Sequence, residues 1–387
     1  MVCTNLYRMK TYSNKNIKAF FALLREGLWE KEVSLSEYGD IDYAAILRLA
    51  EGQSVVGLIT AGLEQVEDVK IPQEWTLQFI GSTLQIEQRN KAMNEYVRKC
   101  FSLLRKNEVY ALLLKGQGIA QCYEKPTWRA SGDVDLFFNA DNYEKAKVAL
   151  VPLAEDAETE YKSLKHFGLT LNGGYVVELH GLFHSRLSKR VDSVIDEVQE
   201  DVFCNGGVRE WDNEGTTIIL PSPDNDVIFV FTHILKHFYI EGIGLRQICD
   251  WCRLLWTYRD SLNCGLLESR IRKAGLMSEW KAFGAFAVKY LGMPESAMPM
   301  FGSSVQKFKG KAKRILDFVL ETGNFGHNRE MKRSGSFFIR KIQGAWFKLR
   351  DFIRHARVFP LDSVKFFFHY AMNGVSVAKD IKANKKR

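Results

Sequence analysis

Two aspartates stand two residues apart in the segment GDVDLFF, where Asp133 and Asp135 flank Val134. The segment has the pattern of a short strand, and successive side chains of a strand point to opposite faces, so both carboxylates are expected on one face. A buried strand normally avoids carboxylates, because a charge that leaves water has to be paired or bound to a metal. The spacing therefore indicates a metal site or a solvent-facing edge, with two surface aspartates near a turn as the simpler alternative.

A third carboxylate lies on the second strand of a predicted hairpin. The segments HFGLTL and YVVELH are joined by Asn-Gly-Gly at 172–174, a strong signal for a hairpin turn. Alternation puts Glu178 and His180 on one face of the second strand. If the two aspartates come to the same point, the three carboxylates repel each other unless divalent cations neutralise them, and such oxygen ligands suit Mg²⁺. Two such ions can hold the attacking and leaving oxygens of a phosphoryl displacement.

A glycine-rich bend precedes the aspartates. The segment VYALLLKG is a continuous apolar run that ends in Gly116, which is typical of a buried strand. GIAQCY then predicts one or two helical turns, and EKPTWRASG predicts a loop. Gly116 and Gly118 would let backbone N–H groups approach a phosphate where the helix begins.

In this order, LLLKGQG, GDVDLFF and VVELH resemble the catalytic core of the DNA polymerase β-type nucleotidyltransferase superfamily. That core has a strand, Gly-Gly or Gly-Ser at a helix start, Asp-x-Asp or Asp-x-Glu on the next strand, and a third carboxylate on a later strand. The combination is closer still to the bacterial family of uncharacterised nucleotidyltransferases. The segments LPSPDNDVIFVFTHILKHF and GIGLRQICDW are similar to the second signature of that family, and the resemblance covers about residues 35–290.

The resemblance implies an enzyme that moves a nucleoside monophosphate from an NTP to a hydroxyl and releases pyrophosphate, with Mg²⁺ as its cofactor. Asp133 and Asp135 would hold the metal ions, and Glu178 would complete the site that lowers the pKa of the acceptor hydroxyl. The cations that would balance the triphosphate charge are Lys115, Arg129 and Arg246. The two arginines are the best candidates for phosphate contacts, because their rigid forks match phosphate geometry.

The bend departs from the family pattern. Gly116-Gln117 stands where Gly-Ser is expected, so the hydroxyl that would touch a phosphate is missing, and Gln117 and Ser131 are the candidates to replace it. The gap between Gly116 and Asp133 is also longer than usual. These departures concern triphosphate binding and not the metal site.

His233 and His237 stand four residues apart, on one face of a predicted helix. The segment HILKH lacks the glutamate of a zinc-protease helix, which excludes that site. Two interpretations stay open. The histidines either fill a helix interface or line the nucleotide-binding cleft, since Lys236, Arg246 and Asp250 lie nearby in the sequence.

Apolar periodicity predicts helices from about residue 15 to 107 and again from Pro221 to about 320. A helix is also predicted over 142–154, capped by Asp141. The fold class expected is therefore α+β, with a minimal mixed α/β nucleotidyltransferase core between helical domains. The predicted parts are a helical N-terminal domain (1–107), the core (108–220), a helical C-terminal domain (221–325) and a basic amphipathic segment (326–387).

Charge is unevenly distributed along the 387 residues. Residues 307–387 hold 20 Lys and Arg against 6 Asp and Glu, a net charge of +14, whereas the rest of the chain has a net charge of −6. A basic tail with interspersed aromatic residues favours an anionic partner, and the segment SVAKDIKANKKR (376–387) is expected to steer such a partner by long-range attraction. A packed C-terminal helix and a solvated basic face are the alternatives.

Seven scattered cysteines favour reduced thiols and a cytoplasmic protein. Cys249 and Cys252 form a Cys-x-x-Cys pair, for which packing inside a helix is favoured over a zinc site, since no second pair completes it. No apolar run approaches the length of a membrane span.

The function expected is thus Mg²⁺-dependent nucleotidyl transfer, with a non-catalytic nucleotide-binding protein and an anionic-surface adaptor as alternatives. The acceptor is unidentified and could be a small molecule, a sugar, a peptide, a protein or RNA. Replacing Asp135 with Asn is expected to abolish transfer and, by relieving carboxylate repulsion, to leave the fold intact or slightly more stable.

Overall fold

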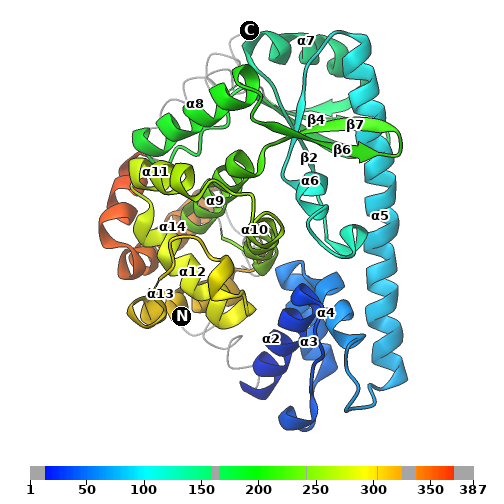
Figure 1. Ribbon diagram of the computed structural model, residues 1–387, viewed down its shortest axis with the longest axis vertical. Coiled ribbons are helices and arrows are strands. Elements are labelled where there is room, and N and C mark those ends of the chain that lie inside the picture. The colour runs from blue at the N-terminus through cyan, green and yellow to red at the C-terminus, as the bar shows by residue number, and fades with distance from the viewer. Residues whose placement is uncertain are drawn as a thin grey trace.

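The structure is a computed structural model that describes residues 14–158, 160, 165–240, 242–302, 304–324 and 337–369. Helices surround a mixed sheet and a separate hairpin, so the α+β class predicted from the sequence is confirmed (Figure 1). The boundaries predicted for the individual domains stay predictions.

One five-stranded sheet carries the predicted chemistry, in the order β1-β2-β5-β4-β3. Its strands are β1 (Leu112–Leu114), β2 (Val134–Phe137), β3 (Ala154–Ala157), β4 (His166–Leu171) and β5 (Tyr175–His180). β2 and β5 pair in parallel, and the other neighbours pair antiparallel. β4 and β5 form the predicted hairpin, in which Gly173 and Gly174 adopt positive φ angles of 92° and 76°. The turn therefore needs both glycines, since other residues rarely adopt this conformation.

The N-terminal helices match the predicted apolar periodicity. They are α2 (Asn14–Trp29), α3 (Tyr43–Gln53), α4 (Val56–Leu63) and α5 (Gln73–Lys106). α2 and α4 lie so close that a Cβ at Gly27 would fall 1.9 Å from the backbone oxygen of Leu58. Gly57 similarly lies against the backbone of Trp128, so α4 supports the loop that leads to the aspartates.

The longest helix, α5, connects the two ends of the molecule. It runs along one side from the N-terminal helices to the sheet (Figure 1). Inside α5, the side-chain amide of Asn90 donates to the backbone oxygens of Thr127 and Arg129, both at 2.7 Å. A buried amide that binds two carbonyls of one loop fixes the course of that loop.

The remaining helices form the other side of the molecule. They are α8 (Lys189–Cys204), α9 (Pro223–Ile240), α10 (Leu245–Thr257), α11 (Cys264–Ala274), α12 (Met277–Leu291), α13 (Ser304–Thr322) and α14 (Phe337–Val358). One hydrophobic cluster runs without interruption from Ala19 in α2 to Phe366, so the N-terminal and C-terminal helices share a core. The sequence had not predicted α8 or the hairpin of β6 (Val208–Asn213) and β7 (Thr216–Pro221) that follows it.

The cap and the end predicted for the helix at 142–154 were wrong. α7 spans Ala140–Leu150, and its N-cap is Asn139, whose side-chain oxygen accepts from the backbone N–H of Asn142. Asp141 lies inside the first turn instead. There its negative charge interacts favourably with the positive end of the helix dipole. A 3₁₀ turn containing Pro152 ends the helix and leads into β3, because proline cannot continue the ladder of helix hydrogen bonds.

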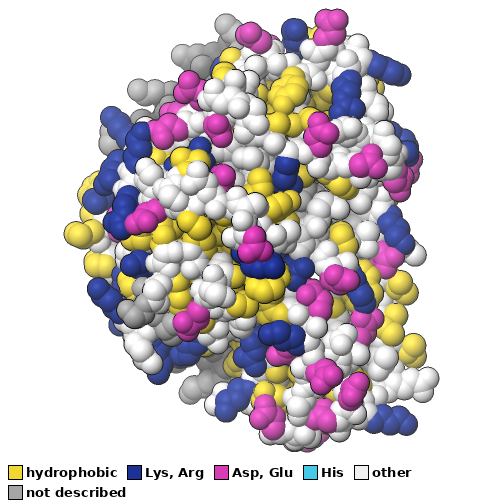
Figure 2. Space-filling model, viewed as in Figure 1, with side chains coloured by type: hydrophobic (Ala, Val, Ile, Leu, Met, Phe, Trp, Pro, Cys, Tyr) yellow, Lys and Arg dark blue, Asp and Glu magenta, His cyan; other side chains and the backbone are white. Residues whose placement is uncertain are grey.

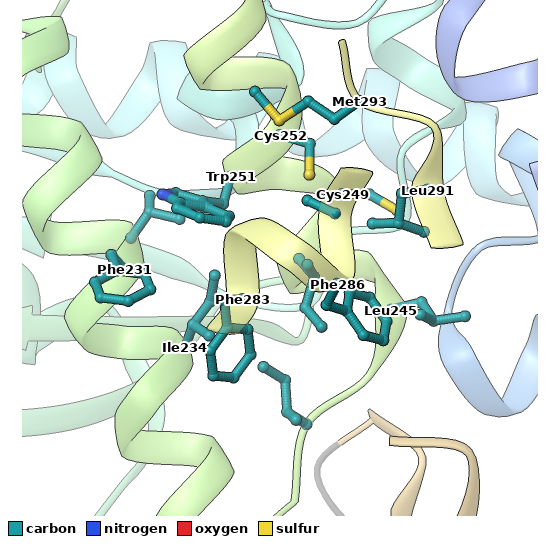
Figure 3. Packing of buried hydrophobic residues seen from close by; sticks show 14 of the residues in the cluster. Phe231, Ile234, Leu245, Cys249, Trp251, Cys252, Phe283, Phe286, Leu291 and Met293 are labelled. Carbon is teal, nitrogen blue, oxygen red and sulfur yellow. The ribbon is translucent and has the colours of Figure 1, made fainter. Parts of the chain in front are cut away.

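The two cysteines of the Cys-x-x-Cys pair are buried in an apolar core (Figure 3). Cys249 and Cys252 pack among residues of α10, α12 and the turn after α12, including Phe286 and Met293. Burial raises the pKa of both thiols. Their complete burial in this core agrees with the packing interpretation.

The basic C-terminal segment is described only for residues 337–369, so the steering segment 376–387 lies outside the described residues. α14 packs against α9 and α13, and His355, Val358 and Phe359 are buried, as a packed helix requires. Its other side exposes Trp346, Leu349 and Ile353. Hydrophobic and basic side chains stand together on this edge of the molecule (Figure 2). Within the described residues, none of the helices combines the length and hydropathy that crossing a bilayer requires.

Glu279 in α12 makes stability depend on pH. Its side chain is fully buried, accepts from the Tyr239 hydroxyl at 3.1 Å, and lies near Asp362 and Lys311. Burial, reinforced by the charge of Asp362, raises the pKa of Glu279 to about 8. The folded state thus holds a proton that the unfolded state releases above about pH 4.5. This contribution to the free energy of unfolding should fall by up to about 1.4 kcal/mol per pH unit as the pH rises from 4.5 to 8.

Urea unfolding of the wild type and of Glu279→Gln between pH 5 and 8 measures this effect. The variant keeps a neutral side chain at every pH, so its stability should decline less steeply across this range. Parallel curves for the two proteins would contradict the assignment.

Candidate active site

The three predicted carboxylates meet over the paired strands β2 and β5, in the interior of the sheet. Asp135 in β2 lies directly opposite Glu178 in the parallel strand β5, and Asp133 immediately precedes β2. One carboxylate oxygen from each residue lies within 4.8 Å of the others. The predicted convergence is therefore observed, and the separation is short enough for the carboxylates to share a divalent cation.

Two basic side chains lie against this cluster. Lys115 Nζ lies 3.0 Å from Asp135 Oδ1, and His180 Nε2 lies 2.9 Å from the same oxygen. Burial would raise the pKa of Asp135, but Lys115 and His180 outweigh it and lower that pKa. Burial alone would lower the pKa of Lys115, but the surrounding carboxylates outweigh burial and raise that pKa. Asp135 is thus held ionised in a buried position.

The surroundings of the other two carboxylates shift their pKa values in opposite directions. The charge of Asp135, together with burial, raises the pKa of Asp133. Burial also acts against ionisation of Glu178, but hydrogen bonds from His166 and His180 outweigh it and lower the pKa of Glu178. His166 Nε2 lies 3.2 Å from Glu178 Oε2. Asp133 is therefore the carboxylate whose charge is least compensated by the protein.

The bend after β1 places Lys115 and Gly116 next to the carboxylates. Lys115 has a φ of 53° and Gly116 a φ of 38°, so the chain turns sharply before α6 (Gly116–Ala120). A residue with a Cβ rarely adopts such a φ, and this conformation is often found at functional sites. Gly118 has a packing role instead, because a Cβ there would lie 2.8 Å from the side chain of Leu220.

Gln117 and Ser131, the proposed replacements for the missing serine, both belong to the scaffold. Gln117 is buried, and its amide donates to Asn90 Oδ1 at 3.2 Å. Ser131 Oγ accepts from Arg129 Nη1 at 2.9 Å. Their contact with a phosphate stays a prediction.

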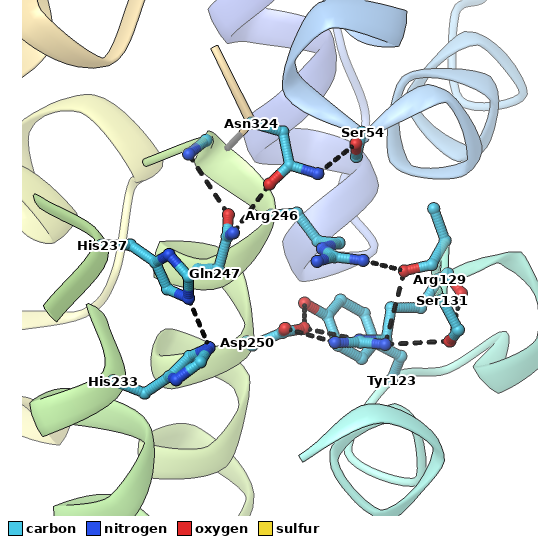
Figure 4. A network of polar contacts seen from close by, with 12 residues as sticks. Ser54, Tyr123, Arg129, Ser131, His233, His237, Arg246, Gln247, Asp250 and Asn324 are labelled. Carbon is cyan, nitrogen blue, oxygen red and sulfur yellow. Dashed lines mark hydrogen bonds and ion pairs between the residues drawn. The ribbon is translucent and has the colours of Figure 1, made fainter. Parts of the chain in front are cut away.

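Arg129 is bound by a buried acidic partner from α10 (Figure 4). Its Nε and Nη2 donate to the two carboxylate oxygens of Asp250 at 2.8 and 2.6 Å. Tyr123 donates its hydroxyl to the same carboxylate at 2.8 Å. Burial works against the charge of Arg129, yet Asp250 raises the pKa of Arg129 above its ordinary value. This bidentate pair fixes the loop that leads to Asp133.

Arg246 also contacts this loop. Its Nη1 donates to the backbone oxygen of Ala130 at 2.8 Å (Figure 4). Burial and the nearby charge of Arg129 lower the pKa of Arg246 to about 10, and its charge acts on Asp133. Arg246 therefore lies in the electrostatic neighbourhood of the carboxylates, although a phosphate contact stays a prediction.

His233 and His237 contact each other on α9, with Nε2 atoms 2.9 Å apart (Figure 4). Burial and the positive charge of Lys115 lower the pKa of His233, so this histidine is neutral. The ring of Phe183 is a neighbour of both His233 and His180, with ring centroids 6.4 and 5.4 Å away respectively. His233 is thus connected to the carboxylate site through a shared aromatic neighbour.

The sequence indicated no role for His166 or Asn90, and it grouped Asp250 with Lys236 and Arg246 without indicating Arg129 as its partner. A signal existed for His166, because the hairpin turn fixes the register and places His166 opposite His180. No local signal pointed to Asn90, whose partners are 37 and 39 residues away in the sequence.

The mixed sheet has Asp-x-Asp at one strand, paired in parallel with a strand that carries a third carboxylate, which is the arrangement that the sequence resemblance predicted for a nucleotidyltransferase core. The chain belongs to the family of uncharacterised nucleotidyltransferases, whose model matches residues 39–292. A search of curated proteins gives no match. Among solved structures, the chain is similar to an antigenic nucleotidyltransferase-like protein from Paracoccidioides brasiliensis. The identity is 14%, the match covers 57% of this chain and 94% of that chain, and the TM-score is 0.31.

Proposed function

We propose that the protein catalyses Mg²⁺-dependent transfer of a nucleoside monophosphate from an NTP to a hydroxyl of an acceptor, with release of pyrophosphate. The observation that carries this proposal is the convergence of Asp133, Asp135 and Glu178 within 4.8 Å. Family membership supports the reaction class.

The donor set fits Mg²⁺. All three carboxylates offer hard oxygen ligands, and the charge of Asp135 together with burial disfavours the charged form of Asp133. An added divalent cation would remove this repulsion. When bound, Mg²⁺ would neutralise phosphate charge and lower the pKa of the acceptor hydroxyl.

Other side chains hold the reacting groups in place. Lys115, 3.0 Å from Asp135, is close enough to the carboxylates to neutralise phosphate oxygens brought there. Arg246 adds a second positive charge near Asp133. The pair of Arg129 and Asp250 holds the loop before Asp133 in one conformation. The site therefore combines ligands for a cation with fixed positive charges for a polyphosphate.

Incubation with each of the four α-³²P-labelled NTPs, Mg²⁺ and a cell extract tests this function. Label should pass to an acceptor in the presence of wild-type protein and Mg²⁺, and not with Glu178→Gln. The exposed Glu295→Gln is the matched control and should behave like the wild type. Equal labelling by wild type and Glu178→Gln would overturn the assignment. A non-catalytic nucleotide-binding protein would instead retain the NTP and label nothing.

A further inference from the structure

We propose that His166, Glu178 and His180 form a second metal site, which binds a borderline transition-metal ion of the Zn²⁺ type. Each of the three side chains offers one ligand atom, and these atoms lie within 4.8 Å of one another. The site shares Glu178 with the carboxylate cluster but uses neither aspartate. The proposal depends on this geometry alone and not on the proposed reaction.

The distances from Glu178 Oε2 to the two histidine nitrogens are close to those between ligand atoms of a zinc site. His166 Nε2 lies 3.2 Å and His180 Nε2 lies 3.4 Å from the same atom, Glu178 Oε2. Zn²⁺ binds nitrogen and oxygen ligands at about 2.0–2.1 Å, so neighbouring ligand atoms of a tetrahedral site are about 3.3 Å apart. The two observed distances lie on either side of this value. His180 Nε2 is also 2.9 Å from Asp135 Oδ1, so a zinc ion would replace this contact of His180 while His166 and Glu178 keep their positions.

The sheet holds the three ligands rigidly. His166 in β4 lies directly opposite His180 in β5, and Glu178 is on the same face of β5. The residue opposite Glu178 is Gly168, which places no side chain of its own between the ligands. The side chain of Glu158 reaches this position, because a Cβ at Gly168 would lie 2.8 Å from its Oε2, and it adds a further acidic group nearby. Ligands on paired strands lose little conformational freedom when an ion binds.

The chemistry of the donors distinguishes the two sites. Two imidazoles and one carboxylate favour Zn²⁺ and similar ions, whereas Mg²⁺ prefers oxygen ligands alone. The side chains of His166, Glu178 and His180 are 24%, 32% and 10% exposed, respectively. An ion can therefore reach the ligand atoms from solvent while the surrounding protein holds the ligands in place. Because Glu178 belongs to both sets, an ion on the histidines would compete with the carboxylate cluster for this ligand.

The test is a Zn²⁺ titration of full-length, metal-free protein. Isothermal titration calorimetry and competition with a chromophoric chelator measure the affinity. The wild type should bind Zn²⁺ at the histidine site. His166→Ala should weaken this binding by about 100-fold, since loss of an outer-shell partner alone costs 10–100-fold. Asp133→Asn removes a carboxylate of the other set and should bind Zn²⁺ as the wild type does.

His184→Ala is the matched control, because His184 also contacts a carboxylate, that of Asp196 at 2.6 Å, but lies outside the cluster. It should bind Zn²⁺ like the wild type. Thermal unfolding of each metal-free variant shows that it is folded, and His166→Gln serves as a second variant if His166→Ala is unstable.

Three results would overturn the proposal: Zn²⁺ binding unchanged in both His166 variants, binding lost in His184→Ala, or binding lost in Asp133→Asn as fully as in His166→Ala. The last result would put the ion on the carboxylates instead. Loss of nucleotidyl transfer has no bearing on this outcome, so the two proposals fail separately.

Discussion

Asp133→Asn is expected to abolish nucleotidyl transfer while leaving the protein as stable as the wild type or slightly more so. Removing one group that stabilises the transition state lowers the rate by about 10²–10³-fold. Loss of a metal ligand should lower it by at least the upper end of this range. Stability should not suffer, because the charge of Asp135, together with burial, raises the pKa of Asp133. An uncharged amide removes this repulsion.

Asp135→Asn should abolish transfer as well, but it should lower stability. The sequence suggested relief of repulsion at this aspartate, whereas the structure shows Asp135 between Lys115 and His180, at 3.0 and 2.9 Å. The substitution leaves buried Lys115 without its closest carboxylate, and breaking a buried pair typically costs about 3–5 kcal/mol. Asp133 and Glu178 still act on Lys115, so a smaller loss of about 2 kcal/mol is expected here.

Transfer assays and urea unfolding of both variants measure these effects, with Asp260→Asn as the control. Asp260 is 86% exposed and pairs only loosely with Arg259, so its substitution should change neither quantity. A more stable Asp135→Asn, or an active Asp133→Asn, would show that the electrostatic roles of the aspartates are not those inferred here.

The second large effect is expected at the buried pair of Arg129 and Asp250. Asp250→Ala removes the carboxylate that accepts from the Nε and Nη2 of Arg129 and from the hydroxyl of Tyr123. Removal of one partner of a buried ion pair lowers the free energy of unfolding by about 3–5 kcal/mol. Transfer should fall too, because the loop before Asp133 loses its anchor.

The double variant Arg129→Met with Asp250→Leu separates stability from function. Apolar replacement of both partners should recover most of the lost stability, since no buried charge remains unpaired. If Arg129 contacts phosphate, as the sequence suggested, the double variant should show a raised KM for NTP. A KM equal to that of the wild type would restrict Arg129 to positioning the loop. No recovery of stability would show that the pair has a further structural role.

The sequence predicted the convergence of the three carboxylates because their arrangement depends on local rules. Strand alternation put Asp133 and Asp135 on one face, and the Asn-Gly-Gly turn fixed the hairpin that carries Glu178. The parallel pairing of β2 and β5 then completed the cluster. The fold class followed from the same periodicities.

What the sequence could not show were contacts between distant segments. Asp250 is 121 residues from Arg129, and nothing near either residue indicates their pairing. The burial of Gln117 likewise depends on α5, which passes over the bend. The cap of α7 was missed for another reason: Asn139 and Asp141 are both good capping residues two positions apart, and the backbone conformation decides between them.

The shared core of the two helical parts has a consequence for synthesis of the chain. Trp29 at the end of α2 donates to the backbone oxygen of Leu291, 262 residues later, and Gln53 in α3 donates to that of Val319, 266 residues later. Segments that emerge first from the ribosome therefore meet their packing partners only when most of the polypeptide has been made. Until then the apolar face of α2 has no α12 to cover it, and exposed faces of this kind are the surfaces that chaperones bind and that aggregate. Contacts of such long range also slow the search for the native topology. Nascent chains released before α12 is complete should accordingly be captured by chaperones or degraded, whereas longer ones should reach protease resistance in a single late step.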